Sequence, residues 1–192
     1  MAKEGRKIKM LNDNRIIRIV VTGPESTGKT ELAQVLSKKL PAVWIPEYAR
    51  TYIENLHRPY GYDDVIQIAR FQICEEADYI SRFESGVLIF DTWLIITKVW
   101  FDLVFGKCPE WVTDHIRSSK IDLFLVCNTD LPWIPDPVRE NGGAMREHLF
   151  HLYCDEIRSF GFSYEIINGF GAARAEHALN AISRYGLNLE SV

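Results

Sequence analysis

Eight residues near the N-terminus have the types and the spacing of a phosphate-binding loop. Residues 23–30 read Gly-Pro-Glu-Ser-Thr-Gly-Lys-Thr and match G-x-x-x-x-G-K-[S/T] at every fixed position. The backbone N–H groups of such a loop surround phosphate oxygens, and the dipole of the following helix adds positive potential. We expect the Lys29 ammonium to reach the β- and γ-phosphates of ATP and the Thr30 hydroxyl to lie on Mg²⁺. The predicted ATP-binding residues of the loop are Gly23, Glu25, Ser26, Thr27, Gly28, Lys29 and Thr30.

The segments on either side of the loop are those that the motif needs. The β-branched residues of 16–21 predict a buried strand before it, and residues 29–40 carry apolar side chains at helical spacing after it. The same pattern can match by chance in an ordinary turn, but a strand and a helix in place argue against that alternative. Gly23 and Gly28 allow backbone angles and close approaches that a side chain would block.

Asp91 follows a short apolar run, 87–90, that predicts a buried parallel strand. Ligands of open α/β sheets bind at the carboxyl ends of the strands, where a carboxylate beside a phosphate loop can orient Mg²⁺. The alternative is that Asp91 only caps the helix that follows it. Because the phosphate loop stands on its own evidence, we favour the metal role and expect Thr30 and Asp91 to hold Mg²⁺.

Glu47 leaves the second predicted strand, 42–45, at the same edge of the sheet. A carboxylate there can act as a general base that takes the proton of an acceptor hydroxyl as it attacks the γ-phosphate. Arg50, one turn further on, can hold the acceptor or a phosphate through a bidentate contact. Ordinary helix-start chemistry explains these residues equally well, with Pro46 at the first helical position and Glu47 in the first turn. The spacing alone leaves both interpretations open.

A stretch rich in Pro and Gly, at about residues 132–146, has the composition of a mobile lid. It follows the fourth predicted strand, so Arg139 and Arg146 can close onto the transferring phosphate and stabilise its charge. The alternative is a surface loop with solvated arginines. We favour the lid, since phosphoryl transfer must exclude water, and assign both arginines to ATP binding.

Strands and helices alternate along the chain, which predicts an α/β fold with a mainly parallel sheet. We expect a flexible N-terminal segment at 1–14 and one domain over 15–192. Within that domain, we expect Tyr48, Gln72 and Trp93, which are close to the predicted site, to line a pocket for a flat, base-like ring. The predicted strands are 15–22, 42–45, 87–90, 121–127 and 164–167. The predicted helices are 29–40, most of 47–84 with a break near 58–61, 93–105, 109–119, 144–159 and 172–184.

Composition narrows the class of protein. The chain has 192 residues, 47% of them apolar and 25% charged, which suffices for one globular core. No apolar run reaches the roughly 18 residues of a membrane helix, and the N-terminus lacks the apolar centre of a signal peptide. A net charge of −4 argues against nucleic-acid binding, and the four cysteines form no C-x-x-C pair. We expect a cytoplasmic protein that binds a small-molecule nucleoside and no membrane; a homo-oligomer stays open.

Four segments together resemble the ribosylnicotinamide kinase domain of NadR-type proteins: G-P-E-S-T-G-K-T, I-P-E-Y-A-R, L-I-F-D-T and P-W-I-P-D-P-V-R. The resemblance covers about residues 15–185. Many families share the phosphate loop, whereas E-Y-x-R and W-[V/I]-x-D-x-x-R are more specific. It implies ATP-dependent phosphorylation of the 5′-hydroxyl of nicotinamide riboside, which gives nicotinamide mononucleotide for NAD salvage. It also implies a three-layer P-loop NTPase fold of the nucleotide-kinase type, with a parallel five-stranded sheet in the order 2-3-1-4-5.

The resemblance also implies roles for individual residues. It places Lys29 and Thr30 at ATP and Mg²⁺, Asp91 as the acidic residue at a strand end, and Asp136 and Arg139 on the lid. The segment at 45–50 also resembles that of deoxynucleoside kinases, whose carboxylate is the base, and this favours Glu47 as the base. The predicted catalytic residues are Lys29, Glu47, Asp91 and Arg139. The predicted substrate-binding residues are Glu47, Tyr48, Arg50, Gln72, Asp91, Trp93 and Asp136.

The chain also departs from the NadR pattern. Full NadR-type proteins carry an adenylyltransferase domain with an H-x-G-H-type signature before the kinase, and about 15 residues without that signature stand there in this sequence. We therefore expect no synthesis of NAD from the mononucleotide and no DNA binding through a helix-turn-helix segment. No residue pattern in the sequence identifies the base of the acceptor nucleoside, so the protein could instead be a kinase of another nucleoside. An ATP-binding regulatory module without an acceptor is the third possibility.

Overall fold

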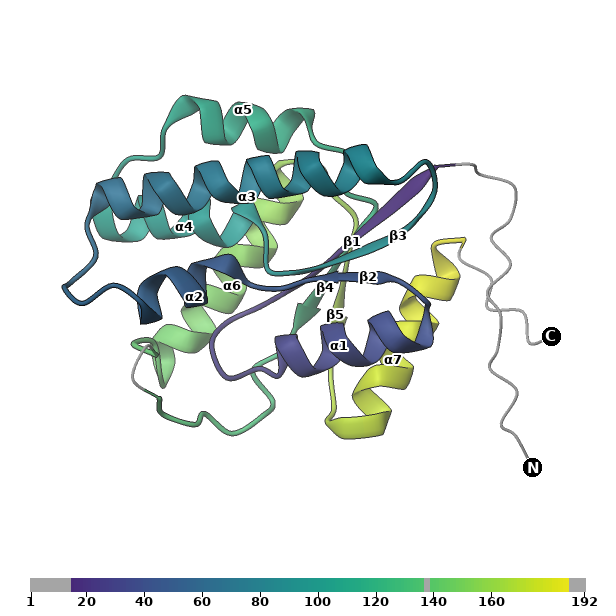
Figure 1. The fold of residues 1–192 in the computed structure, drawn as a ribbon. Coiled ribbons are helices and arrows are strands. Elements are labelled where there is room, and N and C mark those ends of the chain that lie inside the picture. The colour runs from purple at the N-terminus through teal and green to yellow at the C-terminus, as the bar shows by residue number, and fades with distance from the viewer. Residues whose placement is uncertain (1–14, 137–138, 187–192) are drawn as a thin grey trace.

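Five parallel strands form one sheet in the order β2-β3-β1-β4-β5 (Figure 1). The computed structural model describes residues 15–136 and 139–186, so the N-terminal segment predicted at 1–14 lies outside the described residues. The sheet order and the parallel pairing expected from the sequence are confirmed. The strands are β1 (Ile16–Thr22), β2 (Val43–Ile45), β3 (Gly86–Asp91), β4 (Leu123–Cys127) and β5 (Tyr164–Ile167).

Helices connect the strands within the described ranges, and their ends lie within one or two residues of the predicted ones, except that the break predicted near 58–61 already begins after Glu54. None of these helices is both long and apolar enough to cross a membrane. They are α1 (Lys29–Lys39), α2 (Tyr48–Glu54), α3 (Tyr62–Arg82), α4 (Leu94–Phe105), α5 (Glu110–Ser118), α6 (Ala144–Ser159) and α7 (Gly171–Arg184).

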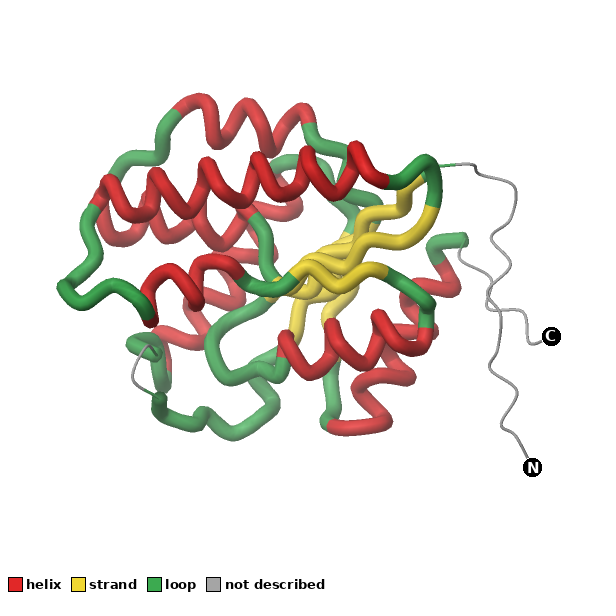
Figure 2. The backbone as a smooth tube through the Cα atoms, in the orientation of Figure 1, coloured by secondary structure: helices red, strands yellow, loops and turns green. Residues whose placement is uncertain are grey.

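The sheet is buried between two layers of helices (Figures 1 and 2). Side chains alternate between the two faces of a strand, so each strand contributes to two separate cores. On β1, Ile19 and Val21 pack with residues of α1 and α7, whereas Val20 packs with residues of α3, α4, α5 and α6. This explains why the central strands are nearly continuous apolar runs.

The carboxyl ends of β1, β2 and β3 meet at one edge of the sheet. Val21 pairs with Asp91, and Ile45 pairs with Phe90, the residue before Asp91. The phosphate loop after β1, the carboxylate that ends β3 and the segment after β2 therefore begin side by side. As expected from the sequence, β2 lies two places from β1.

Candidate active site

The phosphate loop joins β1 to α1 in a conformation that requires glycine at two places. Gly28, directly before α1, has φ 72°, and Gly23 has φ 137°. A Cβ at Gly23 would lie 2.7 Å from the carbonyl oxygen of Cys127, closer than such atoms approach. Inside the loop, the Thr27 hydroxyl and the Lys29 ammonium each donate to the carbonyl oxygen of Pro24 at 2.8 Å. Lys29 thus lies across the loop that would hold the phosphates.

Arg146, near the start of α6, holds the phosphate loop through hydrogen bonds to backbone carbonyl groups. Its guanidinium donates to three backbone carbonyls, those of Glu25 at 3.0 Å, Ser26 at 2.9 Å and Leu131 at 2.7 Å. Only 6% of the residue is exposed, and this burial lowers the pKa of the guanidinium. In this conformation Arg146 holds the loop by its carbonyls, and its predicted contact with ATP stays a prediction.

The lid predicted at 132–146 lies against the phosphate loop through side chains of the loop itself; residues 137–138 are outside the described part. The Glu25 carboxylate accepts from the backbone N–H and the side-chain amide of Asn141, at 2.9 and 3.1 Å. The Ser26 hydroxyl accepts from the Ile134 N–H at 2.9 Å. Glu25 and Ser26 were predicted to bind ATP, and here they connect the loop to the lid.

Asp136 joins two predicted arginines at the lid. Its carboxylate accepts from Arg50 of α2 at 3.1 Å and forms an ion pair with Arg139 at 3.0 Å. Arg50 also pairs with Glu54 at 2.8 Å. The arrangement brings three predicted site residues together from two distant segments.

Asp91 ends β3 as a buried carboxylate without a hydrogen-bond partner among the described residues. The residue is 2% exposed and both of its carboxylate oxygens are unpaired. Burial raises the pKa of the Asp91 carboxyl, while the nearby Thr30 hydroxyl and Lys29 ammonium oppose the rise. The helix-cap alternative is wrong, because α4 begins at Leu94 with Trp93 in the cap position. An unpaired buried carboxylate is costly, and a cation held by Thr30 and Asp91 would offset that cost, so these residues fit Mg²⁺.

Glu47 is positioned by its backbone and not by a capping bond. It precedes α2, and its side chain makes no hydrogen bond to the start of that helix. Since α2 begins at Tyr48, the interpretation that put Pro46 at the first helical position and Glu47 in the first turn is wrong. Burial raises the pKa of the Glu47 carboxyl, Lys29 opposes that rise, and Asp91 reinforces it. Glu47 therefore lies close enough to Lys29 of the phosphate loop and to Asp91 at the end of β3 for their charges to act on it.

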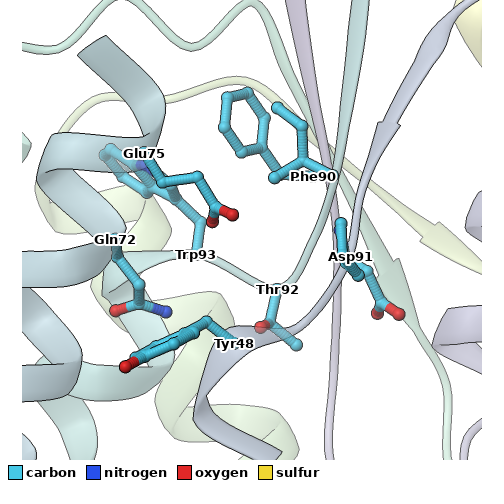
Figure 3. A pocket seen from close by; sticks show the side chains of 9 residues that line it. Tyr48, Gln72, Glu75, Phe90, Asp91, Thr92 and Trp93 are labelled. Atoms are coloured by element: carbon cyan, nitrogen blue, oxygen red, sulfur yellow. The ribbon is translucent and has the colours of Figure 1, made fainter. Parts of the chain in front are cut away.

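A pocket opens beside Asp91 and contains the predicted base-binding residues (Figure 3). Tyr48 and Gln72 lie on one side of it and Asp91 on the opposite side, while Trp93 forms part of the back wall. The space that these side chains enclose is small, about 10 Å³, so a ring-sized ligand requires the lining side chains to move. The structure thus brings Tyr48, Gln72, Asp91 and Trp93 together. The lining residues are Ile45, Pro46, Tyr48, Gln72, Glu75, Phe90, Asp91, Thr92 and Trp93.

Trp93 is fixed by a buried acidic residue that the sequence did not reveal. Its indole N–H donates to Glu76 of α3 at 2.8 Å. The same carboxylate accepts from Arg18 of β1 at 3.0 Å and lies 3.2 Å from a ring nitrogen of His115 in α5. Glu76 is 2% exposed, so these bonds are what make its burial possible. No local sequence pattern predicts this network, because its members lie far apart along the chain.

Glu75 is a pocket residue that the sequence analysis did not single out. A signal was present, because Glu75 follows Gln72 by three residues and such pairs share one face of a helix. Thr92 was also missed; it has φ 65°, an unusual value for a β-branched residue, and its N–H donates to Val21 at 2.9 Å. That bond ties the end of β3 to β1 next to the phosphate loop.

Comparison with known proteins shows what the fold resembles. "Trifunctional NAD biosynthesis/regulator protein NadR" of Salmonella typhimurium is 22% identical over 145 residues, which are 72% of this chain and 35% of that protein. The crystal structure of NadR protein in complex with NR has a TM-score of 0.73 at 23% identity and covers 92% of this chain and 52% of that one. The chain thus spans about a third of the length of the curated relative.

Two further solved structures agree with that likeness in fold. NadR protein in complex with NAD and AMP-PNP has a TM-score of 0.69 at 24% identity, covering 92% of this chain and 51% of that one. Thymidylate kinase from Ehrlichia chaffeensis has a TM-score of 0.62 at 10% identity, covering 88% of this chain and 98% of that one. A family model described as an AAA domain matches residues 18–174. The chain therefore belongs to this AAA-domain family of P-loop proteins and has the fold of a NadR-type, kinase-like domain.

Proposed function

We propose that this protein is an ATP-dependent kinase that phosphorylates the 5′-hydroxyl of nicotinamide riboside and releases nicotinamide mononucleotide. The observation that carries the proposal is the pocket of Figure 3, which is lined by Asp91, the carboxylate next to Thr30 and Lys29 of the phosphate loop. A regulatory module that only binds ATP has no need of such a second pocket. The acceptor is taken from the resemblance to NadR-type kinases, one of which has been crystallised with NR.

On the nucleotide side of the site, positive and N–H groups bind the phosphates of ATP and neutralise their charge. The N–H groups of the phosphate loop and the Lys29 ammonium bind the phosphate oxygens of ATP, and Lys29 leaves its bond to Pro24 to do so. Arg139 and Arg50 neutralise charge that develops on the transferring phosphoryl group once the lid is closed. When bound by Thr30 and Asp91, Mg²⁺ supplies further neutralisation of the β- and γ-phosphate oxygens.

On the acceptor side, the protein supplies a general base and holds the nucleoside in position. Tyr48, Gln72 and Trp93 hold the base of the nucleoside, so the 5′-hydroxyl points to the phosphate loop. Glu47 accepts the hydroxyl proton as the hydroxyl oxygen bonds to the γ-phosphorus. The bond from that phosphorus to the oxygen that bridges to the β-phosphate breaks, and ADP leaves with the electron pair. Glu47 then returns its proton to solvent.

Asp91→Asn is expected to retain ATP affinity while raising the Mg²⁺ concentration needed for half-maximal turnover about tenfold or more. The change removes the buried charge and keeps the shape of the side chain. A magnesium titration of turnover, with nucleotide binding measured on the same preparation, checks this. Identical titration curves for the two proteins would leave Asp91 without a metal role.

We expect the raised pKa of Glu47 to determine the acid limb of the pH dependence of kcat/KM. The base works only when it is ionised, so the rate falls as the pH drops through the pKa of the folded protein, which burial lifts above the ordinary 4.5. Gln at position 47 cannot titrate, so Glu47→Gln should lose this contribution to the acid limb. Rates measured from about pH 5 to pH 8 for both proteins test it. Acid limbs that superimpose would assign the limb to another group.

A panel of nucleosides tests the proposed acceptor. Nicotinamide riboside, adenosine, cytidine, uridine and thymidine are each supplied with ATP and Mg²⁺, and the monophosphates are separated and measured. We expect nicotinamide riboside to have the highest kcat/KM of the set. A higher value for any other nucleoside would replace the acceptor and keep the kinase, whereas no monophosphate from any of them would contradict the proposed function.

A further inference from the structure

Glu75 faces the acceptor pocket without a partner. Figure 3 shows its carboxylate directed into the space between Gln72, Phe90 and Thr92. Within residues 15–136 and 139–186 the carboxylate takes part in no hydrogen bond or ion pair, whereas the adjacent Glu76 is held by Arg18, Trp93 and His115. Glu75 and Glu76 are thus neighbours in sequence with opposite situations, one bound into the core and one available to a ligand.

The charge balance of the pocket is negative. Two of its lining residues, Glu75 and Asp91, are acids, and none of the lining residues that the structure describes is Lys, Arg or His. Burial raises the pKa of Glu75, and the negative charge of Asp78 adds to the rise. A positive group in the pocket would act in the opposite direction and stabilise the ionised carboxylate. Since Lys29 acts on Asp91 across the pocket, it is at the Glu75 side that electrostatics favour a cation and disfavour an anion.

Gln72 gives the pocket a directed donor one helical turn before Glu75. Its amide oxygen accepts from the Thr97 hydroxyl at 2.7 Å, so its amide nitrogen is left for the pocket, as Figure 3 shows. A donor at Gln72 and an acceptor at Glu75 complement a primary carboxamide, whose oxygen accepts and whose nitrogen donates. A neutral base with one carbonyl and one amino group offers the same hydrogen bonds but no charge.

The remaining walls suit a flat ring with positive charge. Tyr48 is backed by Phe71, with ring centroids 3.5 Å apart and planes 14° from parallel. Trp93 is held by its bond to Glu76. Ordered aromatic rings bind flat ligands at low entropic cost and attract cations through their electron-rich faces.

We infer that Glu75 is a specificity-determining residue that selects an acceptor whose base is a positively charged ring with a carboxamide. The inference rests on the proposed function and adds the reason why the pocket would take nicotinamide riboside in preference to neutral nucleosides. The unpaired carboxylate, the free donor of Gln72 and the absence of a cation among the lining residues carry it.

The test isolates the ring charge. Nicotinamide riboside is compared with its reduced dihydro form, which keeps the carboxamide and the ribose but has no charge on the ring. The kcat/KM ratio of the charged to the neutral substrate is measured for the wild type, Glu75→Gln and Asp63→Asn. Asp63 is exposed in the first turn of α3 and does not line the pocket, so its variant removes an equal charge outside the pocket.

For the wild type we expect a ratio of about ten or more, which Glu75→Gln lowers about tenfold, mainly through KM, and Asp63→Asn leaves unchanged. The same ratio in wild type and Glu75→Gln would overturn the inference and leave the kinase standing. Turnover of neither substrate by the wild type would instead contradict the proposed function. If Glu75→Gln does not fold, inhibition of the wild type by 1-methylnicotinamide and by nicotinamide decides: tighter binding of the cation supports the inference, and equal binding overturns it.

Discussion

Lys29→Ala is expected to lower turnover by more than about 10³-fold and to weaken ATP binding, with the fold intact. The ammonium is the one cationic side chain of the loop segment 23–30, and we expect it to neutralise charge on the β- and γ-phosphates. Among residues 15–136 and 139–186, its ammonium donates one hydrogen bond, to the carbonyl oxygen of Pro24, so removal costs the fold little. Nucleotide titration, initial rates and thermal unfolding on one preparation separate these effects.

Lys38→Ala provides the matched control for this change. Lys38 lies in the last turn of the same helix, is exposed, and is remote from the loop. We expect its activity to equal that of the wild type. A folded Lys29→Ala protein with normal ATP turnover would rule out the phosphate-loop assignment.

Glu47→Gln is expected to lower the rate of nicotinamide riboside phosphorylation by about 10²- to 10⁴-fold while ATP affinity hardly changes. Gln keeps the size of the side chain and loses the ability to accept the hydroxyl proton. ATP is held by the loop after β1, whereas Glu47 follows β2, two strands away in the sheet. Rates under saturating substrates and ATP binding by titration measure the two quantities separately.

The control for Glu47 is Glu84→Gln, which removes an exposed carboxylate from the connection between α3 and β3. Its kinetics should match the wild type. Full activity with Gln at position 47 would remove Glu47 from the mechanism. Equal losses of ATP binding and turnover would move it to the nucleotide side of the site.

The positions of the strands and helices could be predicted from sequence because the burial pattern determines them. β1, β3 and β4 contribute apolar side chains to both faces and so read as short apolar runs, while α1 and α7 bury one stripe each. The glycines at 23 and 28 marked the loop because backbone geometry demands them there. Strand ends then placed Asp91 and Glu47, since parallel strands present their carboxyl ends together.

The network around the site could not be predicted, because its bonds join residues distant in sequence. Arg146 was assigned to ATP from its charge, but in the structure it donates to carbonyls of residues more than a hundred positions away. The pairing of Glu25 with Asn141 likewise depends on where the lid lies. Glu76 looked like any helical glutamate until its buried partners were known.

The most direct test of the account measures ADP formation by the wild-type protein with ATP and Mg²⁺, in the presence and absence of nicotinamide riboside. We predict that the nucleoside raises the rate by at least about 10²-fold and that one nicotinamide mononucleotide appears for each ADP, since Glu47 and the pocket act only on an acceptor. ADP formation at one slow rate with or without the nucleoside, and no mononucleotide, would contradict it.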